Sequence, residues 1–362
     1  MNFGLKKIDI YIIKKFLGTY FYSILLLAMI IIIFDISEKI DDFIDRKAPV
    51  SAIIFQYYLN FIPYFVNMFS ALFTFIAVIY FTSRMAANTE IIAILSNGIS
   101  FWRMLRPYLI SALILTFLSF GLMNYIIPFT NRSLRSFEKL YIKNPFRVND
   151  MNIHMQISPD TLIYVENYNN MVNIGYRFTM EAIGKDGMTM KMSADMIKWD
   201  SIKGRWKASN YCIRKIEEHK EILRRGKELD TTMSFKPADF ITDIEDAKIM
   251  TYNQLNDYIK KEKLRGNTAV GKFDLERNKR IAFPFANLVM AFIGVALSSR
   301  KVRGGIGMHL GMGIAIAFTF ILMQQVTSVF AVFGNLPPSI ALWIPNMIFA
   351  IIAIFLLRAA PK

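Results

Sequence analysis

Six apolar segments of this 362-residue chain are each long enough to cross the hydrocarbon core of a membrane. A core of roughly 30 Å takes about 20 helical residues to span. Backbone polar groups inside that core have no water to bond, so each isolated segment is expected to be a helix. The alternating pattern that barrel strands need is absent from these segments. The predicted spans are 16–35, 56–81, 107–128, 281–299, 307–332 and 338–357.

The composition agrees with a membrane protein and argues against binding to nucleic acid. Hydrophobic residues make up 54% of the chain and the mean hydropathy is +0.34, which is high for a soluble domain of this length. The formal charge is +15, but a nucleic-acid-binding surface needs basic residues gathered on one solvent face. Many basic residues here flank the apolar segments instead, as signals for membrane orientation do.

Lysine and arginine in the short connections predict the orientation, because basic residues are retained on the cytoplasmic side. On the opposite side, the short loops hold only Lys39, Arg46 and Lys47, set among several acidic residues. We therefore predict that both termini are cytoplasmic and that the long segment from about 130 to 280 lies outside, in the periplasm of a two-membrane bacterium. The basic residues on the predicted cytoplasmic side are Lys6, Lys7, Lys14, Lys15, Arg84, Arg103, Arg106, Arg300, Lys301, Arg303, Arg358 and Lys362.

The residue types that bind metals or form disulfides are scarce. Cys212 is the only cysteine, and His154, His219 and His309 are too far apart for a recognisable metal spacing. We therefore expect no structural disulfide, no metal and no cofactor. The first apolar stretch, Phe16–Phe34, is too long for the core of a signal peptide and lacks a cleavage site after it, so it is interpreted as a retained span.

From Met151 to about Phe240 the apolar pattern changes to a period of two, which predicts antiparallel strands joined by hairpins. The breaks fall at Lys185–Gly187 and Lys203–Gly204. An eight-strand jelly roll and a curved half-barrel both fit this length. Residues 251–280 are predicted to form a linker helix, with Pro284 in the opening turns of the next span. Methionines of this segment are interpreted as core, or alternatively as the lining of a lipid groove: Met180, Met188, Met190, Met192 and Met196.

No catalytic motif is present. The segment Gly266–Lys272 has the spacing of a phosphate-binding loop, but Phe273 stands where a magnesium-binding Ser or Thr is required. No catalytic triad, nucleophile elbow or paired carboxylates accompany it. The chain is therefore not expected to be an enzyme, and any ATP hydrolysis belongs to another subunit.

The cytoplasmic segment Ser83–Gly98 is predicted to form a short helix across the membrane surface. It is expected to cap at Asn88 or Thr89, to bury Ile91, Ile92 and Leu95, and to end at Gly98. Glu90 lies at the start of this helix, where it fits either helix capping or contact with a partner. Further along, Gly307 and Gly311 have a spacing that permits close approach between membrane helices.

Taken together, these features resemble the LptF/LptG family, the membrane subunits of the ABC exporter that extracts lipopolysaccharide from the inner membrane. The resemblance covers nearly the whole chain, and the stretch Phe34–Phe43 favours the LptG side. The motifs that carry it are Leu5–Phe16, Ser83–Ser100, the long insert, Leu275–Pro284 and Asn335–Pro338.

The resemblance implies a membrane α-helical bundle of six transmembrane helices with a periplasmic antiparallel β-jelly-roll domain. It also implies a paralogous LptF or LptG subunit, an LptB-like ATPase dimer, and an LptC-like protein that passes lipopolysaccharide to a periplasmic bridge. The corresponding division is helices one to three at 1–129, with the coupling helix at about 83–98. The outer domain follows at 130–250, the linker at 251–280 and helices four to six at 281–362.

The resemblance also assigns roles to individual residues. Glu90 matches the coupling-helix carboxylate that seats in the ATPase, and Arg84 and Gly98 belong to the same contact. Lys39 matches a basic residue that contacts substrate phosphates, although Glu38 stands beside it where relatives can carry a second basic residue.

A scaffold and a lipid-modifying enzyme are the alternatives to a transporter. A scaffold that binds another envelope protein would carry an outer domain without copurifying an ATPase. A membrane-embedded lipid-modifying enzyme would need acid, base or metal-binding residues inside the spans, and only Asp35 lies at the edge of one.

Overall fold

The computed structural model describes residues 5–142, 151–184, 187–217, 220–240, 245–264, 270–299, 305–334 and 336–359. The chain forms two compact units. The helical unit contains residues 1–143, 248–252 and 274–362, and the β unit contains residues 144–247 and 253–273. The expected combination of membrane helices and an antiparallel β domain is thus confirmed. The predicted turn residues 185–186, the stretch 300–304 and Asn335 lie outside the described residues.

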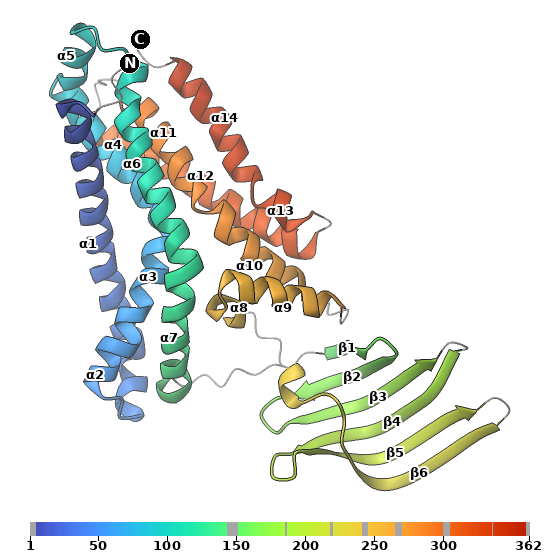
Figure 1. The fold of residues 1–362 in the computed structure, drawn as a ribbon. Helices are drawn as coiled ribbons and strands as arrows, with labels where there is room; N and C mark the ends of the chain where they lie inside the picture. The colour runs from blue at the N-terminus through green and yellow to red at the C-terminus, as the bar shows by residue number, and fades with distance from the viewer. Residues whose placement is uncertain are drawn as a thin grey trace. The chain divides into compact units, whose positions relative to one another are not determined.

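The N-terminal part of the helical unit is built around one unbroken helix, α1, which contacts α3, α4 and α6 (Figure 1). The elements of this part are α1 Lys7–Asp45, α2 Val50–Ala52, the π-helix η1 Ile53–Tyr58, α3 Leu59–Met68, α4 Ser70–Ala87, α5 Glu90–Ser96, α6 Phe101–Gly121, the π-helix η2 Leu122–Ile126 and α7 Ile127–Tyr141.

The C-terminal part begins with short helices and ends with three membrane helices. Its elements are α8 Glu245–Ile249, α9 Tyr252–Leu264, α10 Val270–Ala282, α11 Phe285–Ser298, α12 Gly305–Phe333, α13 Pro338–Ala341 and α14 Ile344–Ala359. The linker expected at 251–280 is therefore two helices, α9 and α10, rather than one. The start of α1 and the end of α14 lie at the same end of the helical unit (Figure 1).

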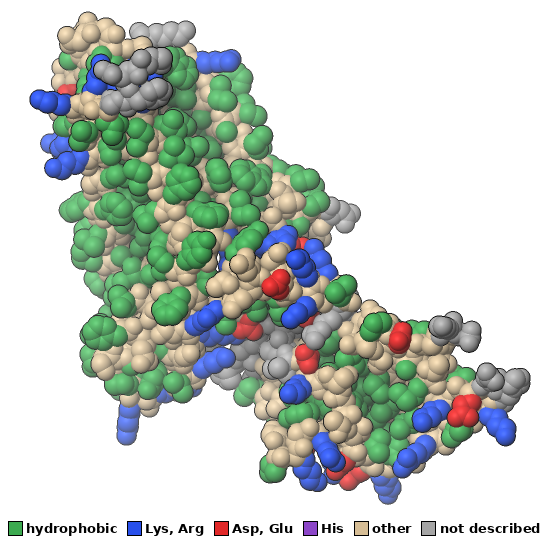
Figure 2. Space-filling view, in the orientation of Figure 1, with side chains coloured by type: hydrophobic (Ala, Val, Ile, Leu, Met, Phe, Trp, Pro, Cys, Tyr) green, Lys and Arg blue, Asp and Glu red, His purple; other side chains and the backbone are tan. Residues whose placement is uncertain are grey.

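The helical unit has the lengths and apolar surface of a membrane domain. Among the described residues, five helical segments are long and apolar enough to cross a membrane, and the pair α10 and α11, bent by 46°, makes a sixth. Figure 2 shows hydrophobic side chains over the visible face of this unit, and Phe21, Leu25 and Phe117 are among those exposed. Such a surface is stable against lipid and unfavourable against water.

Helix α11 lies at the centre of the unit and contacts α4, α6, α12 and α14. Its contact with α4 depends on Gly294, because a Cβ built there would lie 2.9 Å from Val78 Cγ1 and 3.1 Å from Phe75 Cδ2. By contrast, Gly307 and Gly311, which were expected to mediate helix packing, have nothing within 4 Å of such a Cβ. Among the described residues, close approaches to α4 are made at Gly294 and at Gly313, where a Cβ would overlap Ile79 Cδ1.

Three of the described breaks in the membrane helices lie beside an asparagine that donates to a backbone carbonyl. Pro284 cannot supply an N–H, and the α10–α11 bend leaves the Ala282 carbonyl to accept a hydrogen bond of 2.8 Å from Asn346 Nδ2. At η1, Asn60 Nδ2 donates to the carbonyls of Phe55 and Gln56, and at η2, Asn124 Nδ2 donates to Phe120. These bonds replace those that water cannot provide in lipid.

A buried polar network ties α1, α4 and α11 together at the break between α3 and α4. Asn287 Oδ1 accepts hydrogen bonds from the hydroxyls of Ser70, at 2.9 Å, and Thr74, at 2.8 Å. The Ser70 hydroxyl also lies 2.8 Å from the hydroxyl of Tyr20 on α1. Polar side chains inside a bundle add directional contacts that apolar packing lacks, so this network fixes the register of three helices.

The β unit contains a single described sheet of six antiparallel strands in sequential order. Its strands are β1 Met151–Ser158, β2 Thr161–Asn169, β3 Ile174–Gly184, β4 Gly187–Asp200, β5 Arg205–Glu217 and β6 Lys220–Thr231. Of the two expectations, the curved half-barrel is closer than the eight-strand jelly roll. The hairpins join neighbouring strands, and a jelly roll would need crossover connections.

The core of the sheet lies on one face and is covered by the segment after β6. Trp206 Nε1 donates to the Phe235 carbonyl at 2.9 Å, and Phe240 stacks on Tyr168. Met192 is buried in this core and Met180 packs against it, so these two methionines fill the core as favoured above. The segment 265–269 lies outside the described residues, and Phe273 is buried against Tyr258.

A line of irregular backbone positions, called the crease here, crosses strands β2 to β5 of the sheet. On β2, Val165 and Tyr168 are both buried although they are three residues apart, so an additional residue faces outward between them. The crease is polar, with Arg177 paired to Glu166 at 2.9 Å and Asn210 donating to an Asp195 oxygen at 3.0 Å. Arg177 and Asn210 have φ angles of 49° and 52°. The sheet therefore bends along this line.

We predict that Gly294→Ala destabilises the helical unit by about 1 to 3 kcal/mol, because the new methyl group must displace Val78 and Phe75. Gly307→Ala is the matched control, since its methyl group enters open space. The measurement is the thermal unfolding midpoint of the purified protein in detergent. Equal midpoints for the two variants would contradict the central role of the α4–α11 contact.

Candidate coupling and substrate sites

The segment 83–98, expected to contain a short helix that caps at Asn88 or Thr89, holds the end of α4 and then α5. Helix α4 continues to Ala87, the chain turns at Asn88 and Thr89, and α5 begins at Glu90. Thr89 has a φ of 63°, and its hydroxyl donates to the Asn88 carbonyl instead of capping α5. The left-handed residue reverses the chain direction, which hydrophobic periodicity cannot reveal. The expected end is observed, since Gly98 has a φ of 79° and its N–H donates to Leu95.

Glu90 lies at the N-terminal end of α5 and is held from two sides. Tyr11 donates its hydroxyl to Glu90 Oε2 at 3.2 Å, and Asn88 Nδ2 donates to Oε1 at 3.3 Å. The other two residues assigned to this site, Arg84 on α4 and Gly98 after α5, are exposed. Glu90 is thus oriented by α1 while it stays accessible.

The two isoleucines after Glu90 differ in burial. Ile91 is 2% exposed and joins the core of α1, α4, α6 and α11, whereas Ile92 is 56% exposed. The expectation that Ile92 is buried is therefore wrong, because consecutive residues of a helix lie about 100° apart and α5 has only one covered face. Leu95 packs partly against the same core. Helix α5 thus leaves one apolar side chain, Ile92, uncovered within this chain.

An ion pair joins the first turns of α1 and α6. Arg103 on α6 donates to both oxygens of Asp9 on α1, at 2.7 and 2.6 Å. Asp9 also accepts from the backbone N–H of Lys6, and the Ser100 hydroxyl accepts from that of Arg103. Each side chain of the pair therefore lies at the first turn of its own helix. This bidentate arrangement holds α1 and α6 in one relative position.

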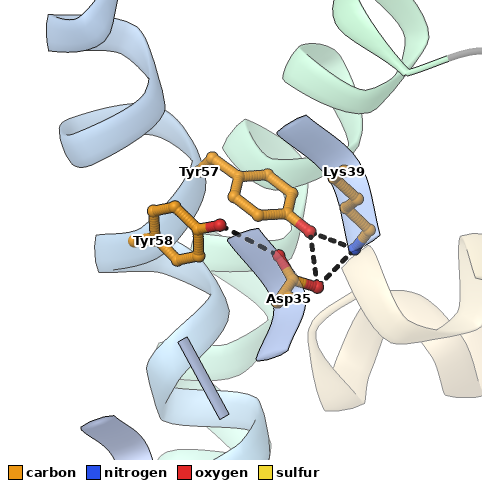
Figure 3. A network of polar contacts seen from close by, with 4 residues as sticks. All are labelled: Asp35, Lys39, Tyr57 and Tyr58. Carbon is orange, nitrogen blue, oxygen red and sulfur yellow. Dashed lines mark hydrogen bonds and ion pairs between the residues drawn. The ribbon is translucent and has the colours of Figure 1, made fainter. Parts of the chain in front are cut away.

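Lys39 lies at the opposite end of α1 and is already engaged (Figure 3). Its ammonium contacts Asp35 Oδ1 at 2.6 Å and the Tyr57 hydroxyl, and it lies 5.0 Å from the centroid of the Tyr57 ring. Tyr58 donates to Asp35 Oδ2 at 3.2 Å. The side chain of Lys39 is 22% exposed and that of Asp35 is 9% exposed. Glu38 is exposed and takes no part in this network.

This network already engages the single cation that Lys39 contributes. A charge-assisted hydrogen bond is worth about 1.5 to 3 kcal/mol, so any other anion would have to offer Lys39 a contact of that order to compete with Asp35. Lys39 is therefore paired within the chain rather than free.

Several residues of these sites were not predicted from the sequence. Asp35 and Lys39 are four residues apart on one helix, and that spacing alone would have indicated the pair. The contacts of Tyr57, and the pairing of Asp9 with Arg103 across 94 positions, have no local signal. The hydrogen bond from the Tyr11 hydroxyl to Glu90 also joins distant positions and has no local signal.

We predict that Lys39→Met lowers the stability of the helical unit by about 1 to 3 kcal/mol, since Asp35 loses its cationic partner in a buried position. Lys47→Met, at an exposed position after α1, should stay within about 0.5 kcal/mol of the unmodified protein. Adding Asp35→Asn to Lys39→Met should restore part of the loss. The measurement is the thermal unfolding midpoint of the purified protein in detergent. Equal midpoints for Lys39→Met and Lys47→Met would contradict the stabilising role of the ion pair.

The comparison with protein families gives one match over almost the entire chain. The model described as lipopolysaccharide export system permease LptF/LptG matches residues 10–359. No curated protein matches the chain. The matched range includes Glu90, Lys39 and their contacts as well as the whole β unit.

Proposed function

The chain belongs to the LptF/LptG family of lipopolysaccharide export permeases, and from this premise we propose that it couples ATP hydrolysis by a partner to extraction of lipopolysaccharide. It is a protein of the inner membrane and a transporter component. Its proposed partners are an LptB-like ATPase dimer, the paralogous LptF or LptG subunit and an LptC-like protein. The observation that carries the proposal is the family match over residues 10–359, which includes both sites described above.

Helix α5 is the proposed contact with the ATPase. A docking element needs side chains that stay accessible, and on α5 Ile92 is exposed and Glu90 is partly exposed. The attachment of α5 to the bundle supports transmission, since Ile91 is buried among α1, α4 and α6 while Tyr11 binds the docking carboxylate. A movement imposed on α5 would therefore reach α1 directly.

Helix α1 is the proposed substrate surface. An acylated lipid needs apolar area for its chains and cations for its phosphates, and α1 offers exposed apolar side chains such as Ile33 and Ile36 just before Lys39. We place the phosphates of lipopolysaccharide at Lys39, in competition with Asp35. Because Lys39 is the only base that this network offers among the described residues, further cations would come from the paralogous subunit.

The proposed cycle is a shift of population between an open and a closed arrangement of the paired subunits. ATP binding closes the ATPase dimer, α5 follows, and the apolar cavity between the subunits becomes too small for the acyl chains. The lipid then leaves toward the periplasm, the compartment to which we assign the β unit because the basic residues of the short connections favour a cytoplasmic α5. An LptC-like protein receives it there.

We predict that Glu90→Ala leaves lipopolysaccharide bound to the reconstituted complex but lowers ATP-driven extraction at least about fivefold, the smallest change expected for a coupling contact. Ser96→Ala, exposed on the same helix, is the matched control. Tyr11→Phe removes one hydrogen bond to Glu90 without removing the carboxylate, so it should lie between the two. Normal extraction by the Glu90→Ala complex would remove Glu90 from the mechanism.

Isolation of the complex distinguishes transport from a scaffolding role. We predict that the chain, extracted in mild detergent, copurifies with an ATPase and with bound lipopolysaccharide, both detected by mass spectrometry. An envelope protein recovered without any ATPase would instead favour a scaffold.

A further inference from the structure

A groove of about 630 Å³ lies between α1 and α4, near the start of α1, and has no place in the proposed transport mechanism. Its α1 side is formed by residues that share one helical face, because they are spaced by three, four and seven positions. The residues that give the groove its chemistry are Tyr11, Lys14, Lys15, Thr19, Tyr22 and Tyr80. Two ammonium groups and several hydroxyls therefore line one cavity.

The groove is electropositive and its polar groups are accessible. Lys14 and Lys15 are both exposed, and Lys15 Nζ lies 5.8 Å from the centroid of the Tyr11 ring. No carboxylate lines the groove among the described residues. The complementary ligand is an anion that accepts several hydrogen bonds, which is the chemistry of a phosphate group.

The surface beyond the groove shows what kind of phosphate fits. The same face of α1 continues into exposed apolar side chains, with Leu25 and Met29 following Gly18 and Tyr22 at helical spacing. A free phosphate would use only the basic end of this surface. An amphiphile would use both, with its phosphate at Lys14 and Lys15 and its acyl chains along Leu25 and Met29. Basic pockets between membrane helices bind anionic lipids in this way.

We propose that the α1–α4 groove binds the phosphate headgroup of an anionic phospholipid of the surrounding membrane. This lipid is distinct from the transported one, since Lys15 and Lys39 are roughly 36 Å apart along α1 at the usual helical rise. The groove also adjoins the coupling site, because Tyr11 lines it and donates to Glu90 at 3.2 Å. Headgroup occupancy therefore influences how Glu90 is presented, a consequence that rests on the proposed function.

The test is a titration of the purified full chain, with its copurifying subunits, by native mass spectrometry using phosphatidylglycerol and phosphatidylcholine. We expect a preference for phosphatidylglycerol that falls about tenfold or more in Lys14→Gln/Lys15→Gln. The matched control is Lys7→Gln/Arg106→Gln, which removes two exposed charges from the same end of the bundle outside the groove. This control should bind like the unmodified protein.

Three outcomes would overturn the proposal. An equal loss in the control variant would mean general attraction of basic residues to an anionic surface. Competition by inorganic phosphate as strong as that by the lipid would mean a free anion. Absence of bound phosphatidylglycerol in the unmodified protein would mean that another subunit covers the groove. The lipid titration requires neither ATP nor lipopolysaccharide, so a negative result would not bear on the role of Glu90. Conversely, normal extraction by the Glu90→Ala complex would not bear on the lipid site.

Discussion

The helical unit depends on satisfying backbone carbonyls that lose their helical partners inside an apolar environment. Uninterrupted helices do this automatically, but the described residues include two π-helices and a bend of 46° between α10 and α11. Asn60 and Asn124 donate to carbonyls of the preceding turn at the π-helices, and Asn346 on α14 donates to the Ala282 carbonyl at the bend. Such asparagines let the helices change direction without exposing unpaired groups to lipid, and the packing around α11 rests on the directions so obtained.

The charged contacts of α1 gather at its two ends, while the middle of the helix carries mainly apolar side chains and Tyr20, whose hydroxyl contacts Ser70. At one end, Asp9 is held by Arg103 and Tyr11 reaches Glu90. At the other end, Asp35 holds Lys39. This distribution follows from the cost of placing charge in hydrocarbon. It also places the proposed ATPase contact and the proposed lipopolysaccharide contact at opposite ends of one helix.

Much of the architecture could be predicted from the sequence, because long apolar runs and period-two alternation report directly on lipid-facing helices and on a sheet with one covered face. The reversal at Thr89 and the crease at Arg177 and Asn210 could not, since neither rests on glycine at the strained position. For the candidate site, the segment carrying Glu90 and the residue Lys39 were found from motifs. Their partners Tyr11 and Tyr57 come from other helices, and no local pattern encodes such contacts.

The unbroken length of α1 has a mechanical consequence. Its 39 residues correspond to roughly 58 Å at the usual rise, nearly twice the thickness of a hydrocarbon core of about 30 Å. A stiff rod of that size that tilts about its midpoint moves its two tips in opposite directions. Displacement of the tip near Tyr11 toward the bundle axis would therefore swing the tip near Lys39 away from it, with no hinge needed in between.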